Sequence, residues 1–270
     1  MINNLRFELS FNNISQLENK LNFCKFNNLN NINIPCKGNI KKELFNSTIK
    51  YISQNFQEFD VTYHYSLYHQ YSRNREKSYQ DFLHFLNFLK NSYSKKNYKI
   101  LLVSGSNKKK NFDTLNVLSN LKKEKNLKVK VGIAYNPYLK KYYNVSSERE
   151  SFDQKISSRL INSIWFQYGT DIQVLHEEVT YLNNALNNEK LNMFGSLFIP
   201  SKQFVARFKF RPWKGVYISK KFLYSLENFY AFTRDLISFY KKNNITPVIE
   251  TDFSSSEKLN AVYSFLENEG

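Results

Sequence analysis

Eight short apolar runs, separated by longer amphipathic stretches, constrain the fold of this chain more than any other feature of its sequence. Several runs are apolar at nearly every position, which is typical of parallel strands buried on both faces. The predicted strands cover residues 5–10, 31–35, 59–66, 99–106, 130–135, 163–169, 193–200 and 245–251. Eight strands alternating with helices over roughly 250 residues predict a (β/α)8 TIM barrel, formed by residues 1–270 as a single domain. An open doubly wound sheet is the alternative, and the lack of a glycine-rich phosphate loop before a helix disfavours it.

The stretches between the strands carry the period of amphipathic helices. Residues 79–93 place four apolar side chains on one helix face: Phe82, Phe85, Leu86 and Leu89. Asp113 is in position to cap the N-terminus of a helix within residues 112–125. One long helix is predicted over residues 220–242, with cations at its C-terminal end, where the helix dipole favours them. Further helices are predicted over residues 41–56, 148–161 and 171–188.

Basic residues outnumber acidic ones and give the chain a formal net charge of +16. A basic surface attracts polyanions such as nucleic acid, anionic membranes or polyglutamylated small molecules. Here, however, the lysines are spread over many segments, and the chain is rich in Lys, Asn, Ile, Tyr and Phe, as products of AT-rich coding sequences are. We therefore interpret the charge as compositional and expect neither a nucleic-acid partner nor a membrane partner.

The sequence also predicts where the protein resides. No apolar run approaches the roughly 20 residues of a membrane-spanning helix. The N-terminal stretch "MINNLRFELS" lacks the charged and then apolar layout of a signal peptide. Cys24 and Cys36 are the only cysteines, too few for a disulfide framework and not in a metal-ligand spacing. These features predict a protein of the reducing cytoplasm.

Polar side chains stand where several predicted strands end. In a barrel the carboxyl ends of the strands meet on one face, where enzymes of this fold place their active sites. The side chains are Glu8, His64, Ser104, Ser106, Tyr135, Asn136 and Gln167. Glu8 is the most informative, because an unpaired buried carboxylate costs several kcal/mol and needs a partner or a function. A salt bridge from Glu8 to a neighbouring Lys or Arg is the structural alternative.

Other candidates carry weaker signals. We expect His69, His84 and His176 to be solvated, and no His, Cys, Asp or Glu set has metal-ligand spacing. Residues 206–218, "ARFKFRPWKGVYI", alternate cations with aromatic residues, a pattern that can stack on nucleic-acid bases. In a barrel they are better interpreted as the loop after strand seven, where anionic ligands are often held.

The order of these signals resembles the methylenetetrahydrofolate reductase family over nearly the whole chain. The motifs that carry the resemblance are "FELS", "INIP", "TYHYS", "LLVSGS", "GIAYNPY", "SSERESFDQKISS", "IWFQYGTD" and "GSLFIP". The resemblance implies a (β/α)8 barrel that binds FAD, takes hydride from NADH or NADPH and reduces the methylene carbon of a folate. Folate and NAD(P)H are then the expected partners, and a homo-oligomer is possible.

The resemblance also implies roles for individual residues. Glu8 matches the glutamate that acts as general acid when the imidazolidine ring of the folate opens. Gln167 matches the glutamine that hydrogen-bonds the pterin. Both are expected to be catalytic.

Five further positions are implied to lie at the FAD site. His64 and Tyr135 match residues beside the flavin, while Glu148 and Lys155 match the pair that holds the ribose and the diphosphate. Glutamate stands at 148 where the family commonly has aspartate, and one residue is inserted after Lys155. Ser106 occupies the place of an aspartate in the family's R-G-D motif, which here is Ser104-Gly105-Ser106. A serine cannot supply that negative charge, so the flavin electronics and the folate contacts are expected to differ.

Three hypotheses stay open at this point. The first is a flavin-dependent reductase of a folate-bound one-carbon unit. The second is a divergent barrel that acts on another C1 carrier, or that moves hydride from the nicotinamide without flavin, and the change at Ser104-Gly105-Ser106 favours it. The third is a non-catalytic barrel that binds a ligand or partner, or a basic protein that binds RNA.

Overall fold

Hydrogen bonding between neighbouring strands orders β1 to β8 into a closed barrel in the computed structural model, which describes residues 5–38, 40, 42–93, 98–104, 112–124, 129–143, 148–187 and 190–267. Neighbouring strands are parallel wherever their register is defined. Helices alternate with the strands along the chain. The fold is therefore the predicted (β/α)8 barrel.

All eight predicted strands are present, and most are shorter than predicted at one or both ends. Their bounds are β1 Arg6–Glu8, β2 Asn31–Ile34, β3 Asp60–Ser66, β4 Tyr98–Val103, β5 Val131–Tyr135, β6 Ile161–Phe166, β7 Asn192–Leu197 and β8 Ile245–Ile249. The trimming matters for function, because Gln167 then lies just beyond β6 and Ser104 just beyond β4. Side chains at such positions belong to the loops that follow the strands.

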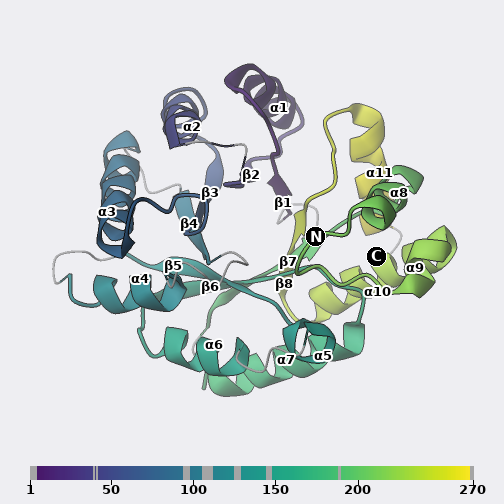
Figure 1. The fold of residues 1–270 in the computed structure, drawn as a ribbon. Helices are drawn as coiled ribbons and strands as arrows, with labels where there is room; N and C mark the ends of the chain where they lie inside the picture. The colour runs from purple at the N-terminus through teal and green to yellow at the C-terminus, as the bar shows by residue number, and fades with distance from the viewer. Residues whose placement is uncertain are drawn as a thin grey trace. The chain divides into compact units, whose positions relative to one another are not determined.

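The chain divides into two compact units, of which the first runs from Arg6 to Ile133. Where it is described, it holds β1 to β4, the beginning of β5 and four helices. Their bounds are α1 Ile14–Phe26, α2 Lys42–Asn55, α3 Arg75–Ser92 and α4 Thr114–Leu121. Figure 1 shows α1, α2 and α3 in a row outside the strands of this unit. The single-domain organisation expected from the sequence stays a prediction.

The second unit runs from Ala134 to Gly270 and includes Leu5. It holds the end of β5, the strands β6 to β8 and seven helices in its described residues. Their bounds are α5 Leu139–Tyr143, α6 Glu148–Ile156, α7 Ile172–Ala185, α8 Lys202–Phe210, α9 Lys220–Tyr224, α10 Leu226–Lys242 and α11 Ser256–Glu267. Figure 1 shows α10 beside β8, and the two elements are in contact.

The helix stripe predicted on residues 79–93 forms the buried face of α3. The four apolar side chains of that stripe are buried: Phe82, Phe85, Leu86 and Leu89. The ring of Phe85 stacks on Phe45 of α2, with centroids 5.7 Å apart, and Phe82 meets Tyr65 of β3 edge-on at 4.9 Å. Aromatic packing of this kind holds the helix row against the strands of the first unit.

Side-chain capping sets where two of the helices begin. Asp113 caps α4 as predicted, and its carboxylate accepts a hydrogen bond from the backbone N–H of Asn116 at 2.9 Å. The predicted single helix over 220–242 is wrong, because the chain breaks at Ser225 into α9 and α10. The Ser225 side chain accepts from the N–H of Asn228 at 3.2 Å and so caps the second helix.

The predicted loop over 206–218 is also partly wrong, because α8 extends to Phe210. Its apolar side chains Val205 and Phe208 are three residues apart and both are buried, so a helix at this place can pack one face against the core. Only residues 211–219 form the loop, and we name them the return segment.

Arg6 is a buried cation that ties the first three strands of the first unit together. Its side chain retains 3% of its surface and donates to the Asn33 Oδ1 atom at 2.9 Å, to the Ile32 carbonyl at 2.8 Å and to the Thr62 Oγ1 atom at 2.8 Å. It also donates to the Asp60 carboxylate at 3.2 Å. A guanidinium can be buried only when its donors are satisfied, and these partners satisfy them across β1, β2 and β3.

Asp60 balances the charge of Arg6. Burial raises the pKa of Asp60, but Arg6 and Lys99 outweigh burial and hold that pKa below its ordinary value. A lowered folded-state pKa means that the carboxylate stabilises the fold above the unfolded pKa of 3.8, and that this contribution is lost as pH falls through the folded value.

We expect Asp60→Asn to lower the free energy of unfolding by about 2 kcal/mol at pH 7, because Arg6 stays buried without its counter-charge. The cost is below that of a fully buried pair, since Asp60 is 39% exposed. The matched control is Glu58→Gln: Glu58 is 44% exposed but pairs with the exposed Lys25, so we expect less than about 0.5 kcal/mol. Urea unfolding from pH 7 down to pH 3 measures both. An unchanged midpoint for Asp60→Asn at pH 7 would contradict the assignment.

Candidate active site

Glu8 stands at the carboxyl end of β1 with its carboxylate almost fully covered. The side chain is 7% exposed, and its Oε1 atom accepts a hydrogen bond from the Lys37 ammonium at 2.9 Å. The same ammonium donates to the Ser10 Oγ atom at 2.8 Å. The salt bridge that the sequence left open as an alternative for Glu8 is therefore present. The pairing leaves a functional role possible, because Lys37 is itself 54% exposed and connects the carboxylate to the solvent.

His64, predicted to contact a flavin, lies beside Glu8 in the first unit. Its Nδ1 atom is 3.9 Å from the Glu8 Oε2 atom, which is beyond hydrogen-bond distance, and its side chain is 14% exposed. Burial lowers the pKa of His64 to about 4, opposed by the charge of Glu8 and assisted by Lys37 and Arg6. The imidazole is therefore neutral at pH 7, so Lys37 supplies the positive charge beside Glu8.

Strand alternation explains why these side chains meet. Arg6 and Glu8 are two residues apart on β1, so they lie on one face, and Thr62 and His64 do the same on β3. The register pairs Glu8 with Asn33 and Asn33 with Thr62, so the polar faces of β1, β2 and β3 coincide. The hydrogen bonds of the buried Arg6 fix this register. Glu8 and His64 are the next residues on the same faces of β1 and β3, toward the carboxyl ends of the strands.

Tyr135, the residue predicted beside the flavin, is 1% exposed at the end of β5. Its hydroxyl donates to the Glu178 carboxylate on α7. Arg149 of α6 holds the same carboxylate with its Nη2 atom at 2.8 Å and its Nε atom at 3.1 Å. Burial raises the pKa of Tyr135, and the hydrogen bond to Glu178 raises it further. The hydroxyl therefore donates its proton to a hydrogen bond within the protein, and the role of Tyr135 beside a flavin stays a prediction.

Glu148 and Lys155 both belong to α6 and interact electrostatically. Burial raises the pKa of Glu148, while Lys155 and the backbone N–H of Asn136, 3.4 Å from Oε1, act in the opposite direction. Lys155 is 7% exposed, which is uncommon for a lysine and places a positive charge inside the second unit. An anionic group such as a diphosphate is a suitable partner for such a charge.

Gln167 follows β6, and its backbone N–H donates to the Tyr135 carbonyl at 2.9 Å, which joins the ends of β5 and β6. Its side chain is half-buried. The adjacent Asn136 has a structural task, because its Nδ2 atom donates to the Gly215 carbonyl at 2.8 Å. Gly215 has φ +84°, a conformation that suits glycine.

The return segment lies against the end of β6 in the second unit. The N–H of Thr170 donates to the Tyr217 carbonyl at 3.0 Å, and the N–H of Ser219 donates to the Thr170 Oγ1 atom at 2.8 Å. The ring of Tyr217 stacks on Tyr142 of α5. Residues 211–219 are therefore fastened across the ends of β5 and β6 by hydrogen bonds and ring stacking.

Of the serines in the Ser104-Gly105-Ser106 motif, the structure describes only Ser104. Its Oγ atom lies 2.8 Å from the Thr114 Oγ1 atom and accepts from the Thr114 N–H at 3.1 Å, so it fastens the start of α4. Ser106, predicted to contact the cofactor, lies outside the described residues.

The histidines that the sequence set aside have exposed side chains. His69 lies in a turn, His84 on α3 and His176 on α7. Among the described residues no group of three His, Cys, Asp or Glu side chains could hold a metal ion. None of the described helices combines the length and the apolar character that crossing a membrane requires. The cytoplasmic location stays a prediction.

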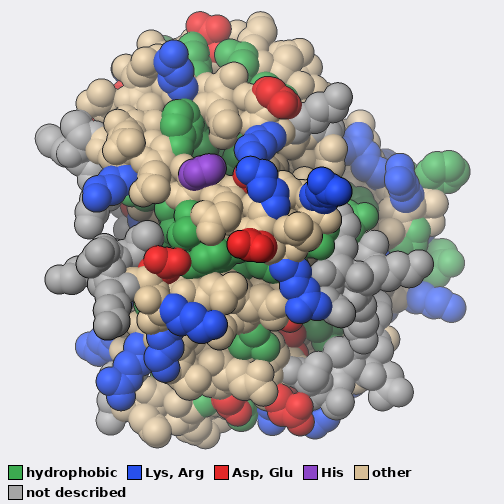
Figure 2. Space-filling view, turned by 60° about the vertical axis from the view of Figure 1, so that its left-hand side comes forward, with side chains coloured by type: hydrophobic (Ala, Val, Ile, Leu, Met, Phe, Trp, Pro, Cys, Tyr) green, Lys and Arg blue, Asp and Glu red, His purple; other side chains and the backbone are tan. Residues whose placement is uncertain are grey.

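Sequence reasoning missed Lys37 and Ser10, which complete the surroundings of Glu8, and Glu178, which binds Tyr135. Lys37 does follow a predicted strand end, as Glu8 and His64 do. Among the 39 lysines and arginines of the chain that position alone did not distinguish it. On the face drawn in Figure 2, Lys and Arg side chains likewise lie in several separate places among acidic and apolar ones.

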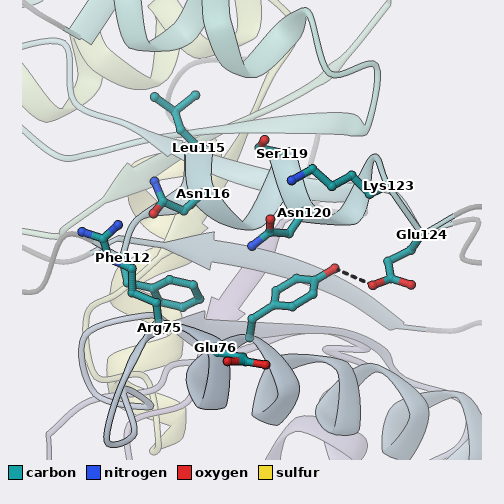
Figure 3. A pocket seen from close by; sticks show the side chains of 10 residues that line it. Arg75, Glu76, Phe112, Leu115, Asn116, Ser119, Asn120, Lys123 and Glu124 are labelled. Atoms are coloured by element: carbon teal, nitrogen blue, oxygen red, sulfur yellow. Dashed lines mark hydrogen bonds between the residues drawn. The ribbon is translucent and has the colours of Figure 1, made fainter.

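A hollow of about 650 Å³ lies between α3 and α4, and its lining does not include Glu8, Lys37 or His64. Figure 3 shows cations and anions on its wall, including Arg75, Glu76, Lys123 and Glu124. The Tyr79 hydroxyl is 3.5 Å from the Glu124 Oε1 atom at its edge. Because the charges on the wall balance, the hollow does not favour an ion of either sign.

We expect the buried neutral His64 to make stability fall with acid. The unfolded chain binds a proton near pH 6.5 while the folded chain binds it at about 4, so the free energy of unfolding drops by up to about 3 kcal/mol between these values. Urea unfolding at pH 7 and pH 4.5 should show a smaller drop in His64→Gln than in the wild type. His84→Gln, at an exposed position on α3, is the control and should keep the wild-type drop. Equal drops in all three proteins would contradict a buried neutral His64.

The comparisons with known proteins reveal the fold and no family. No family model matches the chain, and no curated protein matches it. A solved structure of an uncharacterized protein from Clostridium thermocellum, which binds two copies of 5-methyl-5,6,7,8-tetrahydrofolic acid, superposes with a TM-score of 0.64 at 10% identity, covering 98% of this chain and 93% of that one.

Chitinase structures from Pyrococcus furiosus are also similar. Active domain 2, in catalytic-site mutants with chito-oligosaccharides, has a TM-score of 0.55 at 8% identity, with coverage of 99% and 96%. A catalytic domain of the hyperthermophilic chitinase has a TM-score of 0.53 at 9% identity, with the same coverage. At these identities the likeness establishes the (β/α)8 barrel, and the choice of function depends on the side chains.

Proposed function

We propose that the chain is a reductase of a tetrahydrofolate-bound one-carbon unit, in which hydride from NAD(P)H reduces the methylene carbon while Glu8 protonates the nitrogen released from it. One observation carries the proposal: a carboxylate that is 7% exposed stands at the end of β1, next to an ammonium and a neutral imidazole. Ring opening needs an acid at this kind of position, shielded from water but connected to a proton source.

The similar structure from Clostridium thermocellum supports the choice of substrate class. That protein binds a 5-methyltetrahydrofolate, the kind of product that this reduction would give. Together with the resemblance of "FELS" and "IWFQYGTD" to the reductase family, it favours a folate over an oligosaccharide. In this assignment the half-buried amide of Gln167 binds the pterin edge, because an amide can donate and accept hydrogen bonds at once.

FAD is the proposed resident cofactor, and the chemistry of the second unit fits part of it. Lys155 would meet the diphosphate and Glu148 would accept from ribose hydroxyls, since a buried ammonium needs an anion and a carboxylate accepts from hydroxyl groups. His64, neutral at pH 7, would present an uncharged ring to the flavin. When bound, FAD supplies the hydride chemistry that side chains lack.

One feature of the sequence favours a second candidate. The charges of the family's R-G-D motif are replaced by Ser104-Gly105-Ser106. A barrel with this change can take another C1 carrier, or hydride directly from the nicotinamide. The two candidates differ in whether the protein holds a flavin.

We expect the purified protein to be yellow, with flavin absorption bands that bleach when NADH is added without oxygen. The spectrum before and after NADH measures both the cofactor and the reductive half-reaction. A colourless protein that takes up no added FAD would contradict the flavin-dependent candidate and favour the second one.

We expect Glu8→Gln to lower the turnover of methylenetetrahydrofolate by about 10²-fold or more, because the amide cannot donate the required proton as an acid does. Reduction of the bound cofactor by NADH should change little, since that step does not use Glu8. Glu43→Gln, at an exposed position on α2, is the control and should keep both activities. Loss of both half-reactions in Glu8→Gln would contradict the assigned role.

A further inference from the structure

Lys37 is placed between the covered carboxylate of Glu8 and the solvent. Its ammonium donates to the Glu8 Oε1 atom at 2.9 Å and to the Ser10 Oγ atom at 2.8 Å. The lysine side chain is 54% exposed, whereas the glutamate is 7% exposed. A proton that travels from water to Glu8 along this contact passes through the Lys37 Nζ atom.

The ion pair raises a question about the proposed acid. A carboxylate that accepts a hydrogen bond from an ammonium carries no proton of its own to donate. We propose that Lys37 supplies the proton that Glu8 hands to the substrate, so that the two residues form one proton-donating pair; this inference rests on the proposed function. Lys37 acts through Glu8 and is therefore a positioning and relay residue.

Ligand binding gives the proton a reason to move within the pair. A folate that covers Glu8 and Lys37 removes water from both charges, and paired charges lose much of their advantage when they are desolvated. Transfer of the proton from the Nζ atom to the Oε1 atom neutralises both groups. The Ser10 hydroxyl can then donate to the neutral amine that results, because a hydroxyl both donates and accepts.

The other charged groups around Glu8 do not take over this role. His64 on β3 is 3.9 Å from the Glu8 Oε2 atom and is neutral at pH 7, since its pKa is lowered to about 4. Arg6 lies two residues earlier on β1 and interacts with Asp60, which also binds Lys99 of β4, and a guanidinium does not release its proton in proteins. Of these groups in the described part of the first unit, Lys37 is the one that contacts Glu8, carries a proton at pH 7 and can release it.

The proposed step balances. Hydride that originates on the reduced nicotinamide forms a C–H bond at the methylene carbon, and the bond between that carbon and the folate nitrogen breaks. The electron pair of the broken bond stays on the nitrogen, which takes the proton from Glu8. The nicotinamide is oxidised, the one-carbon unit is reduced, and Lys37 recovers one proton from water.

Two substitutions separate proton supply from positioning. Lys37→Arg keeps the charge and the hydrogen bond but cannot release a proton, so we expect turnover to fall by about 10²-fold while tetrahydrofolate affinity stays within about threefold. Lys37→Met leaves Glu8 to take its proton from water. Its turnover should therefore be low at pH 7.5 and rise about tenfold for each pH unit toward pH 5, whereas the wild-type profile stays flat over that range.

Lys42→Met is the matched control, because Lys42 is 53% exposed and forms a 3.1 Å ion pair with Asp81 in the same unit. It should keep wild-type turnover and a flat profile. Thermal unfolding of each variant checks that it is folded, and tetrahydrofolate binding by calorimetry checks the site independently of turnover.

Wild-type turnover in Lys37→Arg would overturn the inference and leave Lys37 as a residue that only orients Glu8. A loss in folded Lys37→Met that low pH does not restore would overturn it too. Failure of the proposed function looks different: the wild-type protein itself then neither binds tetrahydrofolate nor reduces its methylene derivative, and the inference falls with it.

Discussion

The buried guanidinium of Arg6 is the interaction on which the first unit depends. Its donors reach β2 through Asn33 and Ile32 and reach β3 through Asp60 and Thr62. A shift of any one strand by one residue would leave a buried charge without partners, at a cost of several kcal/mol. The network therefore fixes the register of β1 to β3.

That register also fixes the candidate site. Glu8 lies on the same face of β1 as Arg6, and His64 lies on the same face of β3 as Thr62. The Arg6 hydrogen bonds, which hold the strands together, therefore also place the side chains proposed to carry out the chemistry. The two cations in this region, Arg6 and Lys37, are held in different ways. Arg6 is locked by five hydrogen bonds to strand groups, whereas Lys37 reaches Glu8 from a loop and stays in contact with water. A guanidinium that keeps its proton is suited to holding strands together in the core, whereas an ammonium that can exchange its proton with water is suited to proton transfer.

The barrel alone does not identify the reaction. The same fold relates this chain to a protein that binds 5-methyltetrahydrofolate and to chitinases, at identities of 10% and below. The distinction rests on side chains: a paired carboxylate at the end of β1, a half-buried glutamine after β6 and a buried lysine on α6 offer acid, amide and anion-binding chemistry. The return segment, fastened by Asn136 and Thr170, shows that some strand-end polar groups serve the loops.

The sequence by itself determined the eight strands, the buried stripe of α3 and the Asp113 cap, because these depend on periodicity and on contacts within a few residues. It also singled out Glu8 as a carboxylate in an apolar strand. Only the tertiary structure decided that Lys37, 29 positions away, pairs with Glu8, and that the Tyr135 hydroxyl binds Glu178, 43 positions away. Such partners are chosen by strand register and helix packing, which bring together residues that no local pattern connects.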